Sequence, residues 1–283
     1  MIPLHISNFL TSTLKKKFGG NAKVFNASSL AGGSINSAYK LETSYGCFFI
    51  KFNKLVEKDV FETEAKGLGL LKNKSDIYIP DVIAFNNDCL ILEYIPEKTK
   101  KTNFWENFGI QLAVLHKNTS LNFGLNHNNF IGSIRQLNSN CSSWVDFFIN
   151  NRLKYLLKIG CFPSVFYKKF DLVFKRFDSV FKNESPSLLH GDLWTGNYIC
   201  LGGNSALIDP AVYYGCKEID LGMSLLFGGF DKKFYQGYNS VTYLDNEWKK
   251  RCDFCNFYPL LVHSYLFGSS YFNQTESLLN QYI

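Results

Sequence analysis

The chain has 283 residues, of which 46% are hydrophobic, and a formal net charge of +6 at neutral pH. This length and hydrophobic content suit one large domain or two lobes, and they exclude an intrinsically disordered chain. The basic residues are scattered, and the run Lys15–Lys17 is typical of a solvated helix face, so we expect no nucleic-acid partner.

Neither a membrane segment nor a disulfide framework is evident in the sequence. No apolar run reaches the roughly 18 residues that a membrane helix requires, and the N-terminal lysines follow apolar residues rather than precede them, unlike a secretory signal. The 8 cysteines include one close pair, Cys252 and Cys255, without further ligands for a zinc site. We therefore expect reduced thiols, no membrane association and a cytoplasmic location.

The first elements of the chain are a helix and a glycine-containing turn. Helical spacing of apolar residues predicts an amphipathic helix within residues 1–18. The small-residue segment 28–36 then lies between two β-rich segments, and Gly32 and Gly33, next to Ser34, would let backbone N–H groups approach phosphate oxygens. The segment is neither a Walker loop nor a complete G-x-G-x-x-G, so on its own it favours a hairpin turn.

Lys51 is embedded in an aromatic run, residues 48–52, that predicts a buried strand. Burying an ammonium group is costly without an anionic partner. The candidate partner is Glu64, which borders the apolar face of a helix predicted at residues 60–71. Such a lysine and glutamate position nucleotide phosphates in protein kinases. Alternatively, Lys51 extends its stem from an edge strand and Glu64 faces solvent.

Beyond this helix the pattern changes from strands to helices. Further strands are predicted at residues 77–82 and 89–95, and helices at 103–117, 144–157 and 162–181. Residues 93–95 would connect two lobes, with backbone groups available to an adenine edge. The loop at residues 122–132 is dense in amides and aromatics, and its length suggests a function.

The segment at residues 188–197 carries the strongest chemical signal. An aspartate followed five positions later by an asparagine fits a phosphoryl-transfer loop, in which Asp192 takes a hydroxyl proton and Asn197 holds a metal. Asp209 ends an apolar strand at residues 206–208, and a Gly-Gly-Asn turn would fold both segments into a hairpin. An isolated His-Gly-Asp could be an ordinary polar turn, but the three residues together favour the kinase-like interpretation.

After this hairpin the chain is again helical. Glu218 begins a predicted helix with an acidic first turn, in which Asp220 binds the backbone of the catalytic loop, caps the helix, or does both. The stretch that follows, to Ile283, is apolar and predicted as core helix, with His263 as a core histidine.

Nearly the whole chain resembles the fructosamine kinases (ketosamine-3-kinases), which are related to aminoglycoside and choline kinases. The similar segments are Gly32–Asn36, Lys51, Phe61–Ala65, Asn129–Gly132, His190–Asn197 and Ile208–Ala211. Narrower signatures of this family are Tyr213–Gly215 with Glu218–Leu221, Leu226–Phe230 and Tyr258–His263. In one departure, Ser34 stands where some members have a cysteine that forms an intermolecular disulfide, so that redox switch is not expected.

The resemblance implies an ATP-dependent kinase for the 3-hydroxyl of ketosamines, such as fructosamine, ribulosamine or erythrulosamine adducts, and hence protein deglycation. The fold implied is α+β, bilobed and protein-kinase-like, with an antiparallel-sheet lobe and a helix at 1–92, a mainly helical lobe at 93–283 and a hinge near 93–96. A small-molecule or protein-bound ketosamine would be the partner, and the protein a monomer or weak dimer.

The resemblance also implies the role of each site residue. Asp192 would be the catalytic base, and Asn197 and Asp209 would be the Mg²⁺ ligands. Lys51 and Glu64 would position the phosphates, Gly32, Gly33 and Ser34 would belong to the nucleotide loop, and Glu93 and Ile95 would contact the adenine. Trp194 would contact the ketosamine. One alternative is a related kinase acting on an aminoglycoside, choline or a similar hydroxyl acceptor. Another is a nucleotide-binding scaffold without catalysis, against which the complete polar set argues.

Overall fold

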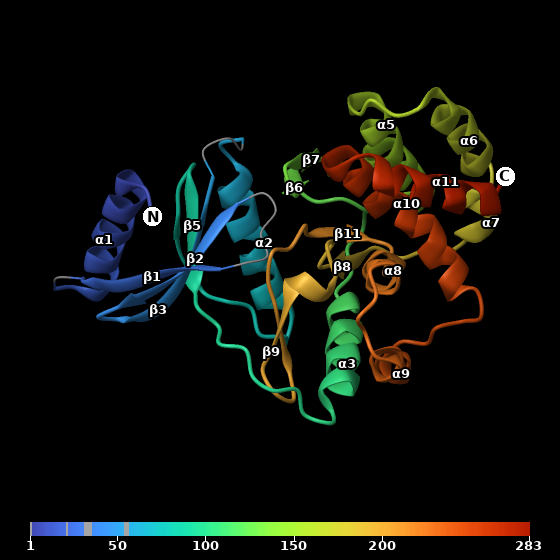
Figure 1. Ribbon diagram of the computed structural model, residues 1–283. Helices are drawn as coiled ribbons and strands as arrows, with labels where there is room; N and C mark the ends of the chain where they lie inside the picture. The colour runs from blue at the N-terminus through green and yellow to red at the C-terminus, as the bar shows by residue number, and fades with distance from the viewer. Residues whose placement is uncertain (1, 21, 31–35, 54–56) are drawn as a thin grey trace.

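The structure is a computed structural model that describes residues 2–20, 22–30, 36–53 and 57–283. Its first part is a five-stranded antiparallel sheet in the order β1-β2-β3-β5-β4, with one helix on each face (Figure 1). The strands are β1 (Val24–Leu30), β2 (Ser37–Thr43), β3 (Gly46–Phe52), β4 (Val82–Phe85) and β5 (Cys89–Glu93). The helices are α1 (Leu4–Phe18) and α2 (Val60–Lys74), as the apolar spacing predicted.

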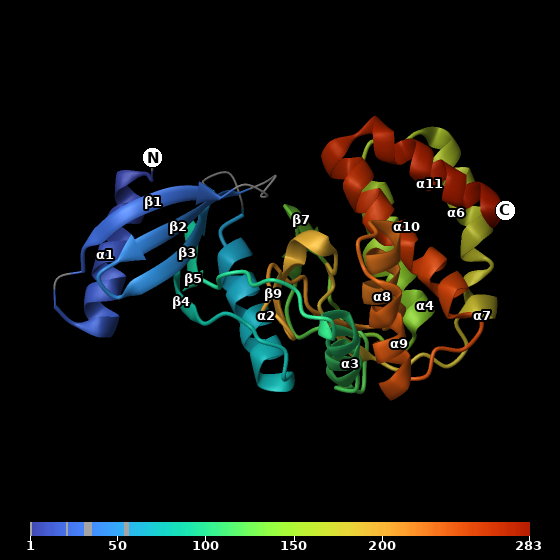
Figure 2. The same ribbon diagram turned by 60° about the horizontal axis from the view of Figure 1, so that its bottom comes forward.

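Alternation along β5 explains why both faces of the sheet are covered. Successive side chains of a strand point to opposite faces. Cys89 and Ile91 share a core with the buried face of α1, whereas Leu90 and Leu92 share another core with α2. The second face brings α2 between the sheet and the rest of the protein (Figure 2).

The strand predicted at residues 77–82 is wrong in its position. In the structure β4 begins only at Val82, and of the predicted segment Tyr78 makes an isolated parallel bridge to Ala206. Pro80 lacks the N–H that a ladder requires, so the segment runs as a connector that buries Ile77 and Ile79 without pairing as a strand.

The second part of the chain is mainly helical, as predicted. Its longer helices are α3 (Phe104–His116), α6 (Ser164–Phe174), α8 (Glu218–Leu226), α9 (Lys232–Val241), α10 (Trp248–Phe267) and α11 (Ser269–Gln281). The helix predicted at 144–157 is present as three consecutive elements, α4 (Trp144–Phe148), the π-helical turn η1 (Ile149–Lys154) and α5 (Tyr155–Ile159). The helix predicted at 162–181 is divided into α6 and α7 (Phe177–Val180). In the described part of the chain no helix could span a membrane.

Three two-stranded sheets accompany the five-stranded sheet. They pair β6 (Asn129–Ile131) with β7 (Ile134–Gln136), β9 (Tyr198–Cys200) with β10 (Ser205–Leu207), and β8 (Ser187–Leu189) with β11 (Tyr213–Gly215). The connector from β5 to α3 is tied to the turn of the β9–β10 hairpin, because Lys98 N–H donates to Cys200 O at 2.8 Å and Lys101 N–H to Gly202 O at 3.0 Å. The division at residues 92 and 93 stays a prediction.

Candidate active site

The β9–β10 hairpin brings together the two segments that the sequence marked as catalytic. Asp192 and Asn197 precede β9, with Asn197 at the end of the short 3₁₀ turn η2 (Thr195–Asn197), and Asp209 follows β10. Ile208 N–H donates to Asn197 O at 3.1 Å, which closes the hairpin at this end. The predicted hairpin is therefore confirmed.

Two unusual backbone positions shape this turn. Gly191 has a φ of 84°, and a Cβ atom there would lie 2.1 Å from Ala211 O, so only glycine fits. Asp209 has a φ of 53°, and it is the one non-glycine residue with positive φ among the described positions. Such strain is found where the surrounding structure holds a functional side chain in place.

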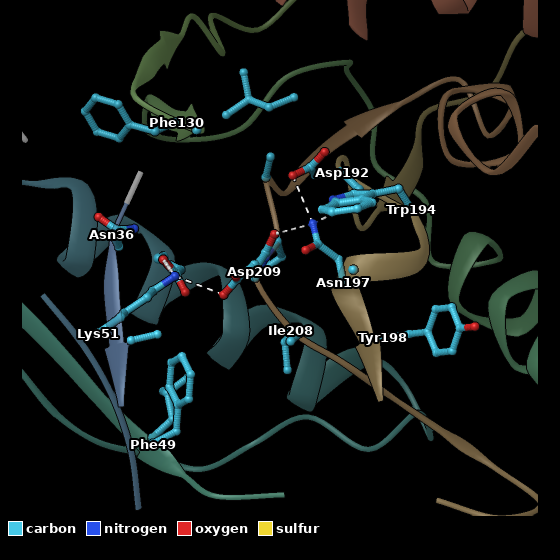
Figure 3. Close-up of a pocket in the computed structure, with 18 of the residues that line it drawn as sticks. Asn36, Phe49, Lys51, Phe130, Asp192, Trp194, Asn197, Tyr198, Ile208 and Asp209 are labelled. Carbon is cyan, nitrogen blue, oxygen red and sulfur yellow. Dashed lines mark hydrogen bonds and ion pairs between the residues drawn. The ribbon is translucent and has the colours of Figure 1, made fainter. Parts of the chain in front are cut away.

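The amide of Asn197 is held by the catalytic segment itself. Its Nδ2 donates to Asp192 O at 2.8 Å, to Asp192 Oδ2 at 2.9 Å and to Asp209 O at 3.4 Å (Figure 3). These bonds use the nitrogen end of the amide, and no described residue donates to its oxygen. Asn197 Oδ1 and the Asp209 carboxylate are therefore oxygen donors of the kind that Mg²⁺ prefers.

Lys51 reaches across from β3 to the same site. Its Nζ lies 2.9 Å from Asp209 Oδ1 and 2.5 Å from Glu64 Oε2 on α2. Burial by itself would lower the pKa of Lys51, but Asp209 and Glu64 outweigh it and raise the pKa above its ordinary value. The predicted pairing of Lys51 with Glu64 is thus present in the structure, with Asp209 as a second partner.

The two carboxyl groups at the centre of the site are stronger bases than usual. Burial raises the pKa of Asp192 to about 7, against the opposing effect of the hydrogen bond from Asn197. Burial also raises the pKa of Glu64, but this carboxylate is engaged in the ion pair with Lys51. A carboxylate with a pKa near neutrality is suited to accept a proton from a substrate hydroxyl.

A cavity of about 630 Å³ joins these residues to the connector and to α10. Glu93 and Ile95 line it, and their contact with an adenine stays a prediction. The Glu93 carboxylate is engaged by Tyr78 OH at 2.5 Å and Asp81 N–H at 3.2 Å. Backbone groups of this segment are therefore better placed to bind a ligand than the Glu93 side chain. Gly32, Gly33 and Ser34 lie outside the described residues.

Trp194 lines the same cavity and is 37% exposed. A Cβ atom on Gly196 would lie 2.4 Å from its ring, so the indole can fold over the turn only because residue 196 is glycine. In Figure 3 the ring lies beside Asp192 and Asn197. The contact of Trp194 with an acceptor stays a prediction.

The prediction of His263 as a core histidine is wrong, because this residue lines the cavity. It is half-buried on α10, lines the cavity, and its Nδ1 lies 2.8 Å from Pro259 O, to which it donates. The ring packs against Phe227, Phe267 and Tyr271 with centroids 4.6, 5.4 and 4.9 Å away. Burial lowers the pKa of His263, so the ring is neutral at neutral pH and Nε2 is a hydrogen-bond acceptor.

The sequence is similar to those of known kinases over nearly its whole length. The model of the fructosamine kinase family matches residues 6–283. A probable ketoamine kinase of Vibrio parahaemolyticus is 36% identical over 288 residues, with 98% of each chain covered. The chloroplastic protein-ribulosamine 3-kinase of Arabidopsis thaliana is 34% identical over 278 residues, which cover 94% of this chain and 85% of the relative.

Solved structures show the same fold. A crystal structure from Thermobifida fusca that carries the name fructosamine-3-kinase has a TM-score of 0.86 at 26% identity, with 96% of this chain and 98% of that chain covered. An ADP-bound aminoglycoside phosphotransferase has a TM-score of 0.64 at 16% identity, with 98% and 97% covered. At that identity the second likeness shows the fold alone.

Proposed function

This chain belongs to the fructosamine kinase family, and we propose that it transfers the γ-phosphoryl group of ATP to the 3-hydroxyl of ketosamines. Kinase activity on a hydroxyl group is the activity of the family. Phosphoryl transfer by this chain is supported chiefly by one observation, the convergence of Asp192, Asn197, Asp209 and Lys51 on a single cavity. The choice of a ketosamine as acceptor is supported by the relatives that are named as ketoamine and ribulosamine kinases. A scaffold protein without catalysis would have no need of this complete set.

The nucleotide would lie between the sheet and the connector. Lys51 is the cation that would contact its phosphates, and Glu64 holds the Lys51 ammonium in the cavity wall. Glu93 and Ile95 would offer backbone groups to the adenine edge. By the family resemblance, Gly32, Gly33 and Ser34 would contribute to nucleotide binding.

Mg²⁺ would be held by Asn197 and Asp209, whose oxygens fit a hard cation. When bound, the metal offsets the negative charge of the phosphates. Asn197 Nδ2 is occupied by Asp192 and the backbone, so its amide cannot turn over without losing these bonds. The chain itself thus keeps the Asn197 oxygen available to the metal.

Catalysis by this site depends on positioning. Asp192 would accept a hydrogen bond from the acceptor hydroxyl and orient its oxygen towards the γ-phosphorus. It would take up the hydroxyl proton as the new O–P bond forms and the bond from the γ-phosphorus to the leaving ADP oxygen breaks. The hydrogen bond from Asn197 to Asp192 Oδ2 leaves Oδ1 for this task. The raised pKa of about 7 makes Asp192 a better proton acceptor than an ordinary aspartate.

The acceptor end of the cavity suits an aminated sugar. Trp194 and Phe267 offer aromatic faces, over which a substituted ammonium group is attracted. His263 offers a neutral nitrogen that can accept a hydrogen bond from an ammonium or hydroxyl group. Phosphorylated ketosamines then decompose, so we propose protein deglycation in the cytoplasm as the role of the reaction.

The proposal is tested by an acceptor panel assayed for ATP consumption. Ribulosamine, erythrulosamine and fructosamine are compared with kanamycin and choline, and the phosphorylated position is assigned by ³¹P and ¹H NMR. We expect turnover of one or more ketosamines with phosphate on the 3-hydroxyl. Turnover confined to kanamycin or choline would indicate the alternative small-molecule kinase. Binding of Mg-ATP without phosphorylation of any acceptor would indicate a scaffold.

A further inference from the structure

The β6–β7 hairpin begins in the amide-rich loop at residues 122–132. It makes a contact that the proposed reaction does not use. On its second strand Arg135 Nη2 lies 2.5 Å from Glu57 Oε2 and 3.2 Å from Asp59 Oδ1. The guanidinium also lies 4.9 Å from the centroid of the Phe130 ring, which lines the cavity. Arg135 therefore joins the cavity wall to the residues directly before α2.

The base of the hairpin is fixed to the segment that follows Asp209. Asn129 Nδ2 donates to Val212 O at 2.8 Å, and Gln136 Nε2 donates to Asn129 Oδ1 at 2.9 Å and to Ala211 O at 3.2 Å. Tyr258 OH on α10 donates to Gln136 Oε1 at 2.8 Å. All these side chains are buried, so the hairpin cannot move at its base without breaking several enclosed bonds.

The other end of the contact is the helix that carries Glu64. Asp59 is the residue before α2, and Glu64 lies in the second turn of that helix. A helix transmits a displacement of its first turn to its next turn, because successive turns are hydrogen-bonded to each other. The position of Arg135 thus bears on the distance from Glu64 to Lys51.

We propose that the β6–β7 hairpin is a latch, in which Arg135 is a positioning residue that holds the start of α2 and thereby sets the Lys51–Glu64 pair for nucleotide binding. This inference rests on the proposed function, since it assigns Lys51 and Glu64 to the nucleotide. The hairpin, whose first strand ends the amide-rich loop, connects the Asp209 side of the cavity to the Glu64 side.

The strength of the latch is limited by its exposure. The side chains of Arg135, Glu57 and Asp59 are 32%, 53% and 39% exposed, so solvent screens the ion pairs. A contact of this kind breaks readily and weakens with added salt. It stabilises the fold little, and its effect is expected on the geometry of α2 rather than on global stability.

The test compares Arg135→Met, Arg135→Lys, Glu57→Gln and the double variant Glu57→Gln/Arg135→Met. Lys169→Met is the matched control, because Lys169 pairs with Glu276 at 2.6 Å between α6 and α11, away from the cavity. The readouts are KM for ATP, kcat, the Kd of a non-hydrolysable Mg-ATP analogue and Tm. Each is measured at low and at high salt.

We expect Arg135→Met to raise KM for ATP and the Kd of the analogue by roughly two- to five-fold at low salt, the range of an exposed ion pair. Arg135→Lys should recover part of this loss. KM and Kd of the double variant should be no higher than those of Arg135→Met, because the two substitutions act on the same contact. Added salt should weaken nucleotide binding more in the wild type than in Arg135→Met, and Lys169→Met should follow the wild type.

A lower Tm in Arg135→Met with unchanged nucleotide affinity would overturn the latch and leave an ordinary structural contact. Additive losses in the double variant would do the same. If the wild type failed to bind the Mg-ATP analogue, the proposed function would fall and the latch with it. The two failures are therefore distinguished by the wild-type titration.

Discussion

Asp220, in the first turn of α8, accepts a hydrogen bond from the backbone N–H of Gly191 at 2.8 Å. Its other oxygen accepts from His190 N–H at 2.8 Å and contacts His116 Nε2 at 3.1 Å. Burial opposes ionisation, but the contacts with His116 and the loop lower the pKa of Asp220 below its usual value. The buried Asp220 carboxylate thus binds the backbone of the catalytic loop. This confirms the expected contact between Asp220 and the loop backbone.

We expect Asp220→Asn to destabilise the protein by about 3 kcal/mol, because a buried charge with three partners is replaced by an amide whose NH₂ faces a backbone donor. Turnover should fall as well, since the loop that carries Asp192 loses its support. Urea unfolding measures the first effect and steady-state assays the second. Asp231→Asn is the control, because Asp231 is an exposed N-cap where asparagine serves equally well. Wild-type stability in Asp220→Asn would contradict the prediction.

Asp192→Asn should lower kcat by about 10²- to 10⁴-fold, the usual contribution of a general base. Binding of Mg-ATP should be nearly intact, because the change leaves Lys51 and Glu64 in place. Asp171→Asn, an exposed position on α6, is the control for loss of a carboxylate. Near-normal turnover of Asp192→Asn would remove Asp192 from its assigned role.

The same variant should be more stable than the wild type at alkaline pH in metal-free buffer. Burial raises the pKa of Asp192 from 3.8 to about 7 in the folded protein. Between these two pH values the folded state keeps a proton that the unfolded state has lost. The wild type therefore loses stability as the pH rises through this range to about 7. Asparagine carries no charge and avoids that loss. The difference in unfolding free energy should be of order 1 kcal/mol or more at pH 8 and shrink towards pH 4. A difference that grows on acidification would have the wrong sign.

Trp194→Ala should raise KM for the ketosamine acceptor by roughly two- to thirty-fold, the range of a lost cation–π contact, and leave KM for ATP unchanged. His263→Ala should act in the same direction, because it removes the acceptor nitrogen at the cavity wall. Tyr243→Ala removes an exposed aromatic ring away from the cavity and serves as the control. A rise in KM for ATP instead of KM for the acceptor would place Trp194 at the nucleotide end.

Arg152→Met should destabilise the protein by about 2–4 kcal/mol. Arg152 is fully buried in the π-helical turn and has no ion pair to any described residue. Its guanidinium lies 4.2 Å from the Tyr213 ring centroid and donates to Asn138 Oδ1 at 2.7 Å, so methionine loses the ring contact and leaves a buried acceptor unpaired. Lys158→Met, an exposed change in the following helix, should have little effect. Comparable stability of both variants in urea would contradict this account.

Patterns that depend on neighbouring residues could be predicted from the sequence. Apolar spacing placed α1, α2 and α3 because a helix buries one face, and the Gly-Gly-Asn turn placed the β9–β10 hairpin between Asn197 and Asp209. The strand at β4 was misplaced because pairing in a sheet depends on a partner strand and not on local composition. His263 was misplaced because a residue on an apolar helix face has the same spacing whether that face meets core or cavity.

By itself the sequence determined which chemical groups are available and which local elements carry them. Only the tertiary structure decided which of them meet, since Lys51 and Asp209 are 158 positions apart, His116 and Asp220 are 104 apart, and Arg135 and Glu57 are 78 apart. The physical reason is that periodicity reports burial along one element, whereas contacts over such separations depend on how whole elements pack. For the same reason Arg135 carries no signal in its own neighbourhood, and its contact with the start of α2 is visible only in the folded chain.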